Sequence, residues 1–212
     1  MSQSSQSIPG FLVVTAAFVS GFCIMTVEML GARIMAPYFG GSLSVWGSIL
    51  TVFMLALACG YLIGGRLSAR HPSLVSYSLF FLGAAGMCLP IIFFADEIMR
   101  PIFLAFEDPR YGSLLASMFL YFIPTTILGM ISPYSIRLLV ENSHHSGQKA
   151  GLLFFVSTIG SAAGTLGTSF YLVLWFEVNE IVLGTAGALT LMGALLLMVG
   201  ITGKEKAHAK NA

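Results

Sequence analysis

The stretch GFLVVTAAFVSGFCIMTVEML, from Gly10 to Leu30, carries one charged residue, Glu28, in an otherwise uncharged and mostly apolar run. A helix needs about 20 mostly apolar residues to cross a bilayer, so this segment is long enough to span a membrane. An ionisable side chain at membrane depth is costly to place and is by default a candidate functional group. Glu28 is therefore the strongest candidate in the segment.

The composition of the whole chain is that of a membrane protein. Of its 212 residues, 57% are hydrophobic and 9% are charged, whereas soluble domains carry about 25% charged residues. A formal net charge of +1 gives no sign of a nucleic-acid partner. The three cysteines lie in apolar runs without CxxC spacing, so neither a zinc site nor a disulfide framework is expected. We expect no cofactor and no metal.

Six apolar segments are long enough to cross the bilayer, which is the expected partner of most of the surface. They are Gly10–Ala36, Ser44–Leu67, Ser73–Ala95, Ser113–Val140, Ala150–Phe176 and Asn179–Ile201. The sequence predicts an all-α integral membrane protein with one six-helix domain over residues 10–201, between tails at 1–9 and 202–212. The N-terminus lacks the basic residues of a signal peptide, so the first helix is expected to be retained.

Basic residues gather on one side of the six predicted helices. They are Arg66, Arg70, His71, Arg137, His144, His145, Lys149, Lys204, Lys206 and Lys210. The connections on the opposite side are mostly acidic. By the positive-inside rule, both termini are expected in the cytoplasm, and the membrane is expected to be a bacterial inner membrane.

Residues 96–112 form the longest predicted external connection. Ile98, Ile102, Phe103 and Phe106 could form one face of a short helix lying at the membrane interface. We expect this helix to act as a surface anchor, with a lid over an external opening as the alternative.

Small residues and prolines mark places where helices approach or bend. Gly160 and Gly164 have the GxxxG spacing that lets two helices pack closely, either within the chain or across a dimer. Pro124 and Pro133 are expected to kink the fourth segment by removing backbone hydrogen bonds. Such kinks either line a substrate cavity or serve structure alone, and the sequence leaves both open.

Glu28 does not face Arg33, because a separation of five residues turns a helix by about 140°. Glu28 instead shares a helix face with Gly21 and Gly31, and glycines make a face suited to close packing. We therefore expect Glu28 to point into the helix bundle. A protonated carboxyl, a cation site and a buried ion pair with another helix all remain open as its role.

Aromatic residues near the predicted external mouth are a second candidate group. Tyr38, Phe39 and Trp46 fit either a belt of interfacial aromatics or a site for an organic cation. Within the spans we find no Ser/His/Asp set, metal-ligand cluster or carboxylate pair. The chain is therefore not expected to be an enzyme.

Several segments resemble the membrane portion of spermidine synthase-like proteins, also described as fused major facilitator/spermidine synthase proteins. EMLGARIMAPYFG (28–40), VWGSI (45–49), GYLIGGRL (60–67), SPYSIRL (132–138) and STIGSAAGTLGTSF (157–170) carry the resemblance in this order. It implies a fold of six transmembrane helices like one half of a major facilitator transporter. Two departures from that superfamily are a glycine, Gly64 or Gly65, in place of the usual aspartate, and Thr165 in place of a proline.

This resemblance implies a small-solute transporter that works as a homodimer of half-transporters, with a polyamine or other organic cation as the first substrate to consider. Glu28 would be the coupling or binding carboxylate. The residues expected to bind substrate or protons are Glu28, Arg33, Tyr38, Trp46, Ser132, Ser157 and Ser161. Those expected to form a cytoplasmic gate are Arg66, Arg70 and Arg137, and those expected to pack helices are Gly160 and Gly164.

The synthase domain of the family would need a strand–GxGxxG–helix nucleotide site, and the sequence offers none. No aminopropyltransferase activity is expected of this chain. The alternative function is a non-catalytic membrane subunit that anchors or feeds a separate soluble polyamine aminopropyltransferase.

Overall fold

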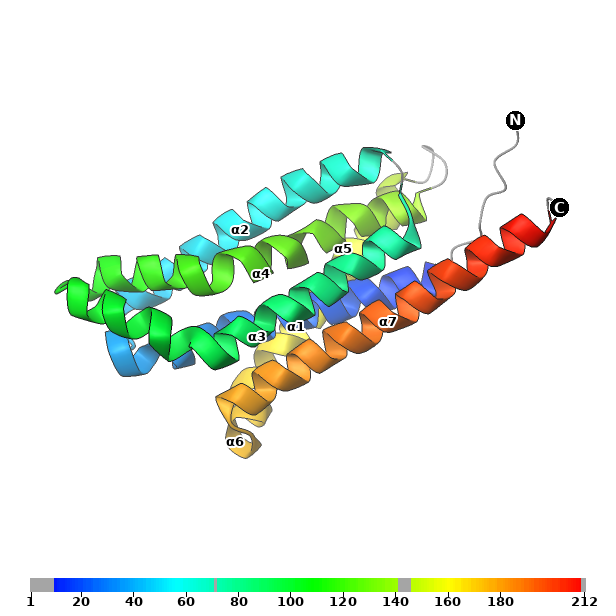
Figure 1. The fold of residues 1–212 in the computed structure, drawn as a ribbon. Helices are drawn as coiled ribbons and strands as arrows, with labels where there is room; N and C mark the ends of the chain where they lie inside the picture. The colour runs from blue at the N-terminus through cyan, green and yellow to red at the C-terminus, as the bar shows by residue number, and fades with distance from the viewer. Residues whose placement is uncertain (1–9, 71, 141–145, 211–212) are drawn as a thin grey trace.

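The computed structural model describes residues 10–70, 72–140 and 146–210, and this part of the chain consists of helices joined by short connections (Figure 1). The helices are α1 (Gly10–Phe39), α2 (Leu43–Arg70), α3 (Leu74–Ala105), α4 (Pro109–Leu139), α5 (Ser146–Gly167), the π-helix η2 (Thr168–Leu172), α6 (Val173–Trp175) and α7 (Val178–Lys210). Six stretches are long and apolar enough to cross a membrane, with α5, η2 and α6 together forming the fifth. The prediction of an all-α membrane protein with six spans is confirmed.

The helices extend past the ends of the predicted apolar runs, and capping residues mark some of their ends. The first helix continues through Pro37 to Phe39 and ends where Gly40 takes φ 77°, a left-handed conformation that glycine adopts without strain. In α4, Asp108 accepts a hydrogen bond from the backbone N–H of Arg110, with Pro109 at the first position of the helix. The last helix runs beyond Ile201 to Lys210.

The prediction of a separate interface helix after Ala95 is wrong. The third helix continues without interruption to Ala105. Met99 is 1% exposed, and Ile98 and Ile102 pack against the hydrophobic core. Part of the predicted face is thus packed against the protein, whereas Phe103 and Phe106 stay exposed, and the segment continues the third helix instead of forming a helix of its own.

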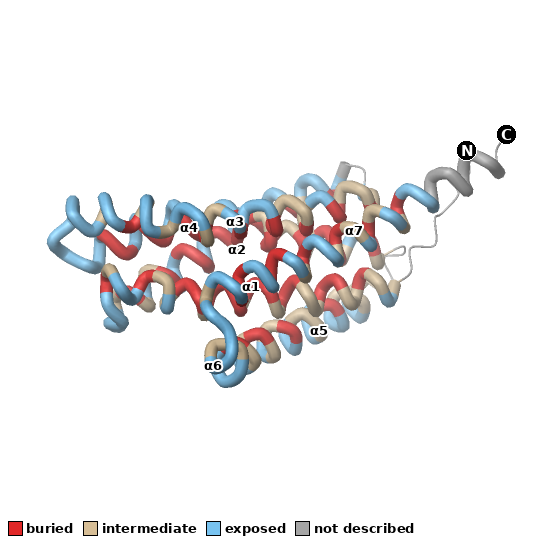
Figure 2. Tube along the Cα trace, turned by 60° about the horizontal axis from the view of Figure 1, so that its bottom comes forward, coloured by how far each residue is buried: buried red, intermediate tan, exposed pale blue. Residues whose placement is uncertain are grey.

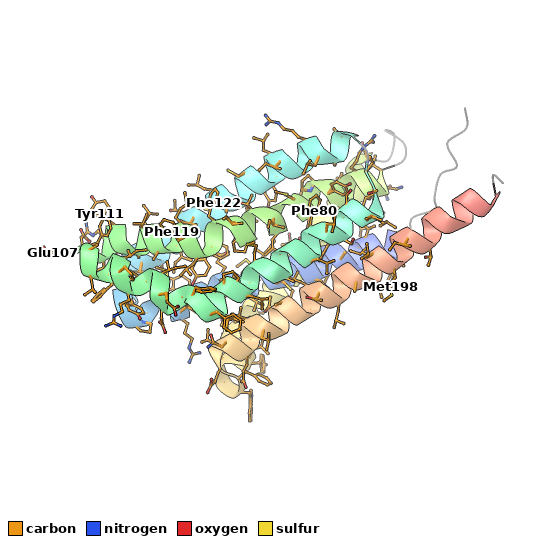
Figure 3. The ribbon with its side chains drawn as sticks, viewed as in Figure 1. Phe80, Glu107, Tyr111, Phe119, Phe122 and Met198 are labelled. Atoms are coloured by element: carbon orange, nitrogen blue, oxygen red, sulfur yellow. The ribbon has the colours of Figure 1, made fainter. Side chains whose placement is uncertain are left out.

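The six spans form a bundle in which α1 lies among the others (Figures 1 and 2). The most extensive contacts are those of α2 with α4, α3 with α7 and α1 with α5. Large apolar side chains such as Phe119 and Met198 project outward (Figure 3). This is the arrangement expected where the surrounding solvent is lipid.

The packing pattern repeats when the first three spans are exchanged for the last three. The pair α1–α5 then corresponds to α4–α2, and the pair α3–α4 corresponds to α7–α1; all four pairs are in contact. Because each half contains three spans, the two halves cross the membrane in opposite directions. This contact pattern is the one expected of an inverted repeat of three helices, an organisation found in many transporters.

Glycines make the corresponding close approaches in the two halves. Gly160 and Gly164 of α5 lie against the backbone of Phe18 and Phe22 in α1. In the other half, Gly60 and Gly64 of α2 lie against the backbone of α4 at residues 126, 129 and 130. Both pairs have the GxxxG spacing, which allows close packing of α5 on α1 in one case and of α2 on α4 in the other.

Candidate functional site

Glu28 lies on α1 and is 7% exposed, as its position on a glycine-bearing face predicted. The only ion pair among the described residues joins Arg110 and Asp108 near a connection, with Nε and Oδ1 4.0 Å apart. No described residue therefore forms the buried ion pair that was one of the roles considered for Glu28. A carboxyl group is placed in the bundle without a cation from the described part of the protein.

Two contacts between α1 and α4 fix the level at which Glu28 lies. The Tyr121 hydroxyl donates a long hydrogen bond of 3.4 Å to the Gly31 carbonyl, and the Ser117 hydroxyl lies 3.2 Å from the sulfur of Met35. Continuing this antiparallel register by one turn places Glu28 level with Pro124 and Thr125.

Thr125 adds a second polar group at this level. Its hydroxyl oxygen is buried and has no hydrogen-bond partner among the described residues. It lies one turn from Tyr121 on the helix face that contacts α1. An unpaired buried hydroxyl costs free energy, so a ligand, ion or water that completed its hydrogen bonds would be favoured there.

The direction of Glu28 follows from its neighbours on α1. Gly31, three residues on, contacts α4, and Gly21, seven residues back, contacts Ser157 and Ser161 of α5. Glu28 is about 60° from the first and about 20° from the second around the helix. It therefore points between α4 and α5, two helices that touch each other only slightly.

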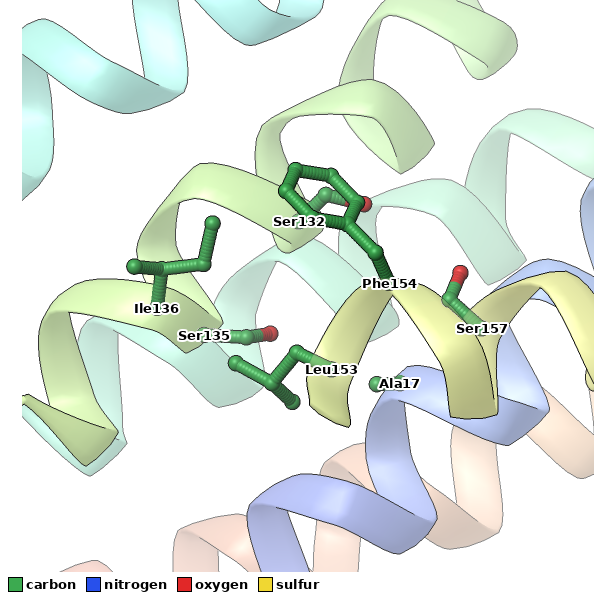
Figure 4. Close-up of a pocket in the computed structure, with 7 residues that line it drawn as sticks. All are labelled: Ala17, Ser132, Ser135, Ile136, Leu153, Phe154 and Ser157. Carbon is green, nitrogen blue, oxygen red and sulfur yellow. The ribbon is translucent and has the colours of Figure 1, made fainter. Parts of the chain in front are cut away.

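A small cavity lies between α1, α4 and α5, nearer the start of α1 than Glu28 (Figure 4). Its volume is about 10 Å³, which is room for about one water molecule. Ser132 and Ser157, both predicted site residues, line it together with Ala17. Ala17 precedes Glu28 by eleven residues, so the cavity is about 16 Å from Glu28 along the axis of α1.

Arg33 and Tyr38 lie elsewhere. Arg33 is exposed and lines two hollows beside the connection between α6 and α7. These hollows lie on the side of the bundle that also carries the α1–α2 and α3–α4 connections, which we call the distal end. The Tyr38 hydroxyl donates to Asp96 Oδ1 at 3.1 Å, and its ring packs edge-on against Phe103. Both therefore belong to the packing and surface of the distal end, and the structure does not bring them to Glu28.

Two further predicted site residues have positions of their own. Trp46 is half-buried near the start of α2. The Ser161 hydroxyl donates to the Gly21 carbonyl at 3.3 Å and so fastens α5 to α1. Together with Gly160 and Gly164, which lie against α1, Ser161 is part of the contact between these two helices.

The predicted gate lies at the opposite, proximal end of the bundle, which carries Gly10 and the α2–α3 connection. Arg66 and Arg137 are exposed there, and the side chain of Arg70 lies outside the described residues. Lys149 donates a hydrogen bond of 2.6 Å to the carbonyl of Leu139 in the last turn of α4. The sequence signal for this contact was a lysine following a helix end whose carbonyls lack partners.

A pair of buried hydroxyls was also missed. Thr168, the first residue of η2, donates to Thr26 of α1 at 3.1 Å. Single turns of π-helix inside α-helices occur frequently at functional sites, and this one begins at the level of Glu28. A run of small and hydroxyl residues was the only signal for it.

The chain matches no model of a known protein family, and no curated protein and no solved structure is found similar to it.

Proposed function

We propose that this chain is half of a small-solute transporter and that a second copy of the chain completes it. The observation that carries the proposal is the buried carboxyl of Glu28, which lacks a cationic partner among the described residues. Ionisable side chains at membrane depth mark substrate or proton pathways. The unpartnered Thr125 hydroxyl at the same level supports a polar occupant.

The inverted repeat supports transport in particular. In transporters built from such repeats, the binding site lies near the middle of the membrane and access alternates around it. Glu28 lies on α1, which contacts helices of both halves, and it points between α4 and α5.

The fifth span supports the second copy. Only 17% of its hydrophobic stretch is buried, against 39% or more in the other spans, and it is also the least hydrophobic of the six. The uncovered side chains of this span are mostly large and apolar, Phe154, Phe155 and Ile159 among them, and can pack against a second copy. In the dimer, two copies of Glu28 supply two carboxylates. Two carboxylates suit an organic dication such as a polyamine.

Reconstitution in liposomes with a pH gradient tests the transport proposal. Uptake of labelled polyamines is measured for the native chain, for Glu28→Gln and for Glu107→Gln, which changes an exposed carboxylate in the α3–α4 connection. We expect Glu28→Gln to abolish coupled uptake while its thermal stability stays at or above that of the native chain, because a buried charge is removed. Glu107→Gln should transport normally.

Unchanged uptake by Glu28→Gln would show that Glu28 is structural and that the mechanism is wrong. If the native chain moves no polyamine, a thermal-shift screen against amino acids, nucleosides and other organic cations identifies ligands, since a ligand bound to the folded state raises its stability.

The dimer is tested separately. Cys59 is exposed on α2, whereas Cys23 and Cys88 are buried, so donor and acceptor dyes on Cys59 should show energy transfer in liposomes.

A further inference from the structure

A groove outside the proposed transport site runs along the first half of α7. Its volume is about 320 Å³, and it lies between α1, η2 and α7. Phe22, Leu172 and Ile181 supply apolar walls, and Gly184 and Ala188 leave its floor open because they lack bulk. It extends from Glu180 to Ala188, about 12 Å along the helix, which is close to the ~15 Å depth of one leaflet.

The groove continues into a polar hollow of about 630 Å³ at the distal end, with which it shares Phe176 and Glu180. Arg33 is the one cationic side chain that lines this hollow, and Glu177 and Trp175 line it as well. One oxygen of Glu180 already accepts a hydrogen bond from the Glu177 backbone N–H at 2.9 Å. Arg33 is thus the group in the hollow that can bind an anion.

A second polar hollow, of about 250 Å³, adjoins the first through Arg33 and Val178. Its acidic residues are Asp96 and Glu97, of which Asp96 accepts a hydrogen bond from Tyr38. Arg33 therefore lies between carboxylates on both sides, with Glu177 on one and Glu97 on the other. No ion pair joins it to either among the described residues.

We propose that the groove and the two hollows bind a phospholipid whose headgroup carries a primary ammonium. One acyl chain lies in the groove, the phosphodiester binds Arg33, and the ammonium binds Glu97 or Glu177. An apolar channel that leads to one cation flanked by carboxylates matches the order of groups in such a lipid. A lipid with a purely anionic headgroup would meet the carboxylates without a compensating charge. The proposal does not depend on the transport function.

The intrinsic fluorescence of Trp175 can report lipid binding at this site. The chain contains two tryptophans, and Trp175 lines the hollow. In a Trp46→Phe background, bilayers containing phospholipids with brominated acyl chains quench the fluorescence of Trp175 according to their occupancy of the groove. We expect brominated phosphatidylethanolamine to bind about threefold more tightly than phosphatidylcholine, whose quaternary ammonium cannot donate hydrogen bonds. Phosphatidylglycerol, which has no ammonium, should bind more weakly than phosphatidylethanolamine.

Two matched pairs of variants locate the site. Gly184→Leu should fill the groove and reduce quenching to that of surrounding bulk lipid. Gly187→Leu, at a glycine that is also exposed on α7 but lies outside the groove, should not. Arg33→Gln should remove the selective component of quenching. Arg110→Gln, which changes an exposed arginine remote from the hollows, should leave it intact.

The carboxylates are tested by Glu97→Gln combined with Glu177→Gln, which should make phosphatidylethanolamine and phosphatidylcholine bind equally. Equal quenching by all three lipids, unchanged in Arg33→Gln and Gly184→Leu, would overturn the proposal and leave only bulk lipid. A preference for phosphatidylglycerol would overturn the assignment of an ammonium. Relief of quenching by soluble glycerophosphoethanolamine would show that the hollow takes a free zwitterion, and this would overturn the assignment of a lipid.

Discussion

Adding a methyl group at Gly164 tests the close contact of α5 with α1. A Cβ at this position would overlap the carbonyl oxygen of Phe22 and lie 3.0 Å from its Cα. These are backbone atoms, which cannot rotate away as a side chain can. The two helices must therefore move apart along their contact. At Gly167, one turn further, an added Cβ meets only the ring of Phe22, at 3.7 Å, which is ordinary van der Waals contact.

The magnitude follows from two opposing effects. Overpacking a well-packed contact costs about 1–3 kcal/mol, and a contact with rigid backbone belongs at the upper end of this range. Alanine gains about 1 kcal/mol over glycine through its helix propensity. We therefore expect Gly164→Ala to destabilise the protein by about 2 kcal/mol. Gly167→Ala should leave its stability unchanged or raise it by up to about 1 kcal/mol.

Thermal unfolding in one detergent measures this difference, which corresponds to a Tm about 4–8 °C lower for Gly164→Ala at this chain length. The same comparison in the other half uses Gly60→Ala, which would press on the α4 backbone, and Gly65→Ala, which has open space. Equal Tm values for Gly164→Ala and Gly167→Ala would refute the close approach of α1 and α5. A cost at Gly164 but none at Gly60 would refute the equivalence of the two halves.

Two further predictions concern polar contacts that hold α4. Tyr77 donates a hydrogen bond of 2.6 Å to Ser135, and both side chains are fully buried; Tyr77→Phe should lower stability by about 1–2 kcal/mol, and an unchanged Tm would contradict this contact. Lys149→Gln removes the cation from the Leu139 carbonyl and should cost about 0.3–1 kcal/mol. Hydrogen exchange of the last turn of α4 should then be up to about fivefold faster, whereas Lys149→Arg should exchange like the native chain.

The number and placement of the spans could be predicted because lipid allows few alternatives. Each backbone polar group in the bilayer must be paired within the protein, so every long apolar run becomes a helix. The helix ends were less predictable. Pro37 and Pro101 suggest helix ends in the sequence, yet they lie inside α1 and α3. The backbone hydrogen bond that each proline removes lies near the end of its helix, where the helix tolerates its loss. Met99 is buried by packing that the sequence alone does not reveal.

The candidate site could be predicted only in part, because a sequence tells which residues share a helix face but not which helices are neighbours. Glycines on the face of Glu28 correctly predicted its burial. Ser132 and Ser157 were expected in the same site as Glu28, yet they meet at a different level because α4 and α5 both contact α1 near Ala17. The unpartnered hydroxyl of Thr125 gave no sequence signal, since most threonines in membrane helices bond to their own backbone.

A comparison of the two halves distinguishes the residues that both use for packing from Glu28, which occurs in one half only. Gly21 of α1 and Gly129 of α4 make corresponding close contacts, with α5 and with α2. Seven residues after Gly21 stands Glu28, whereas seven residues after Gly129 stands Ile136, an apolar residue. A side chain needed to build the repeat would be needed in both halves, as the glycine pairs are. Because the carboxyl occurs in one half only, Glu28 is not part of the shared packing, and its neutralisation should leave the fold intact while removing the charge on which the proposed transport depends.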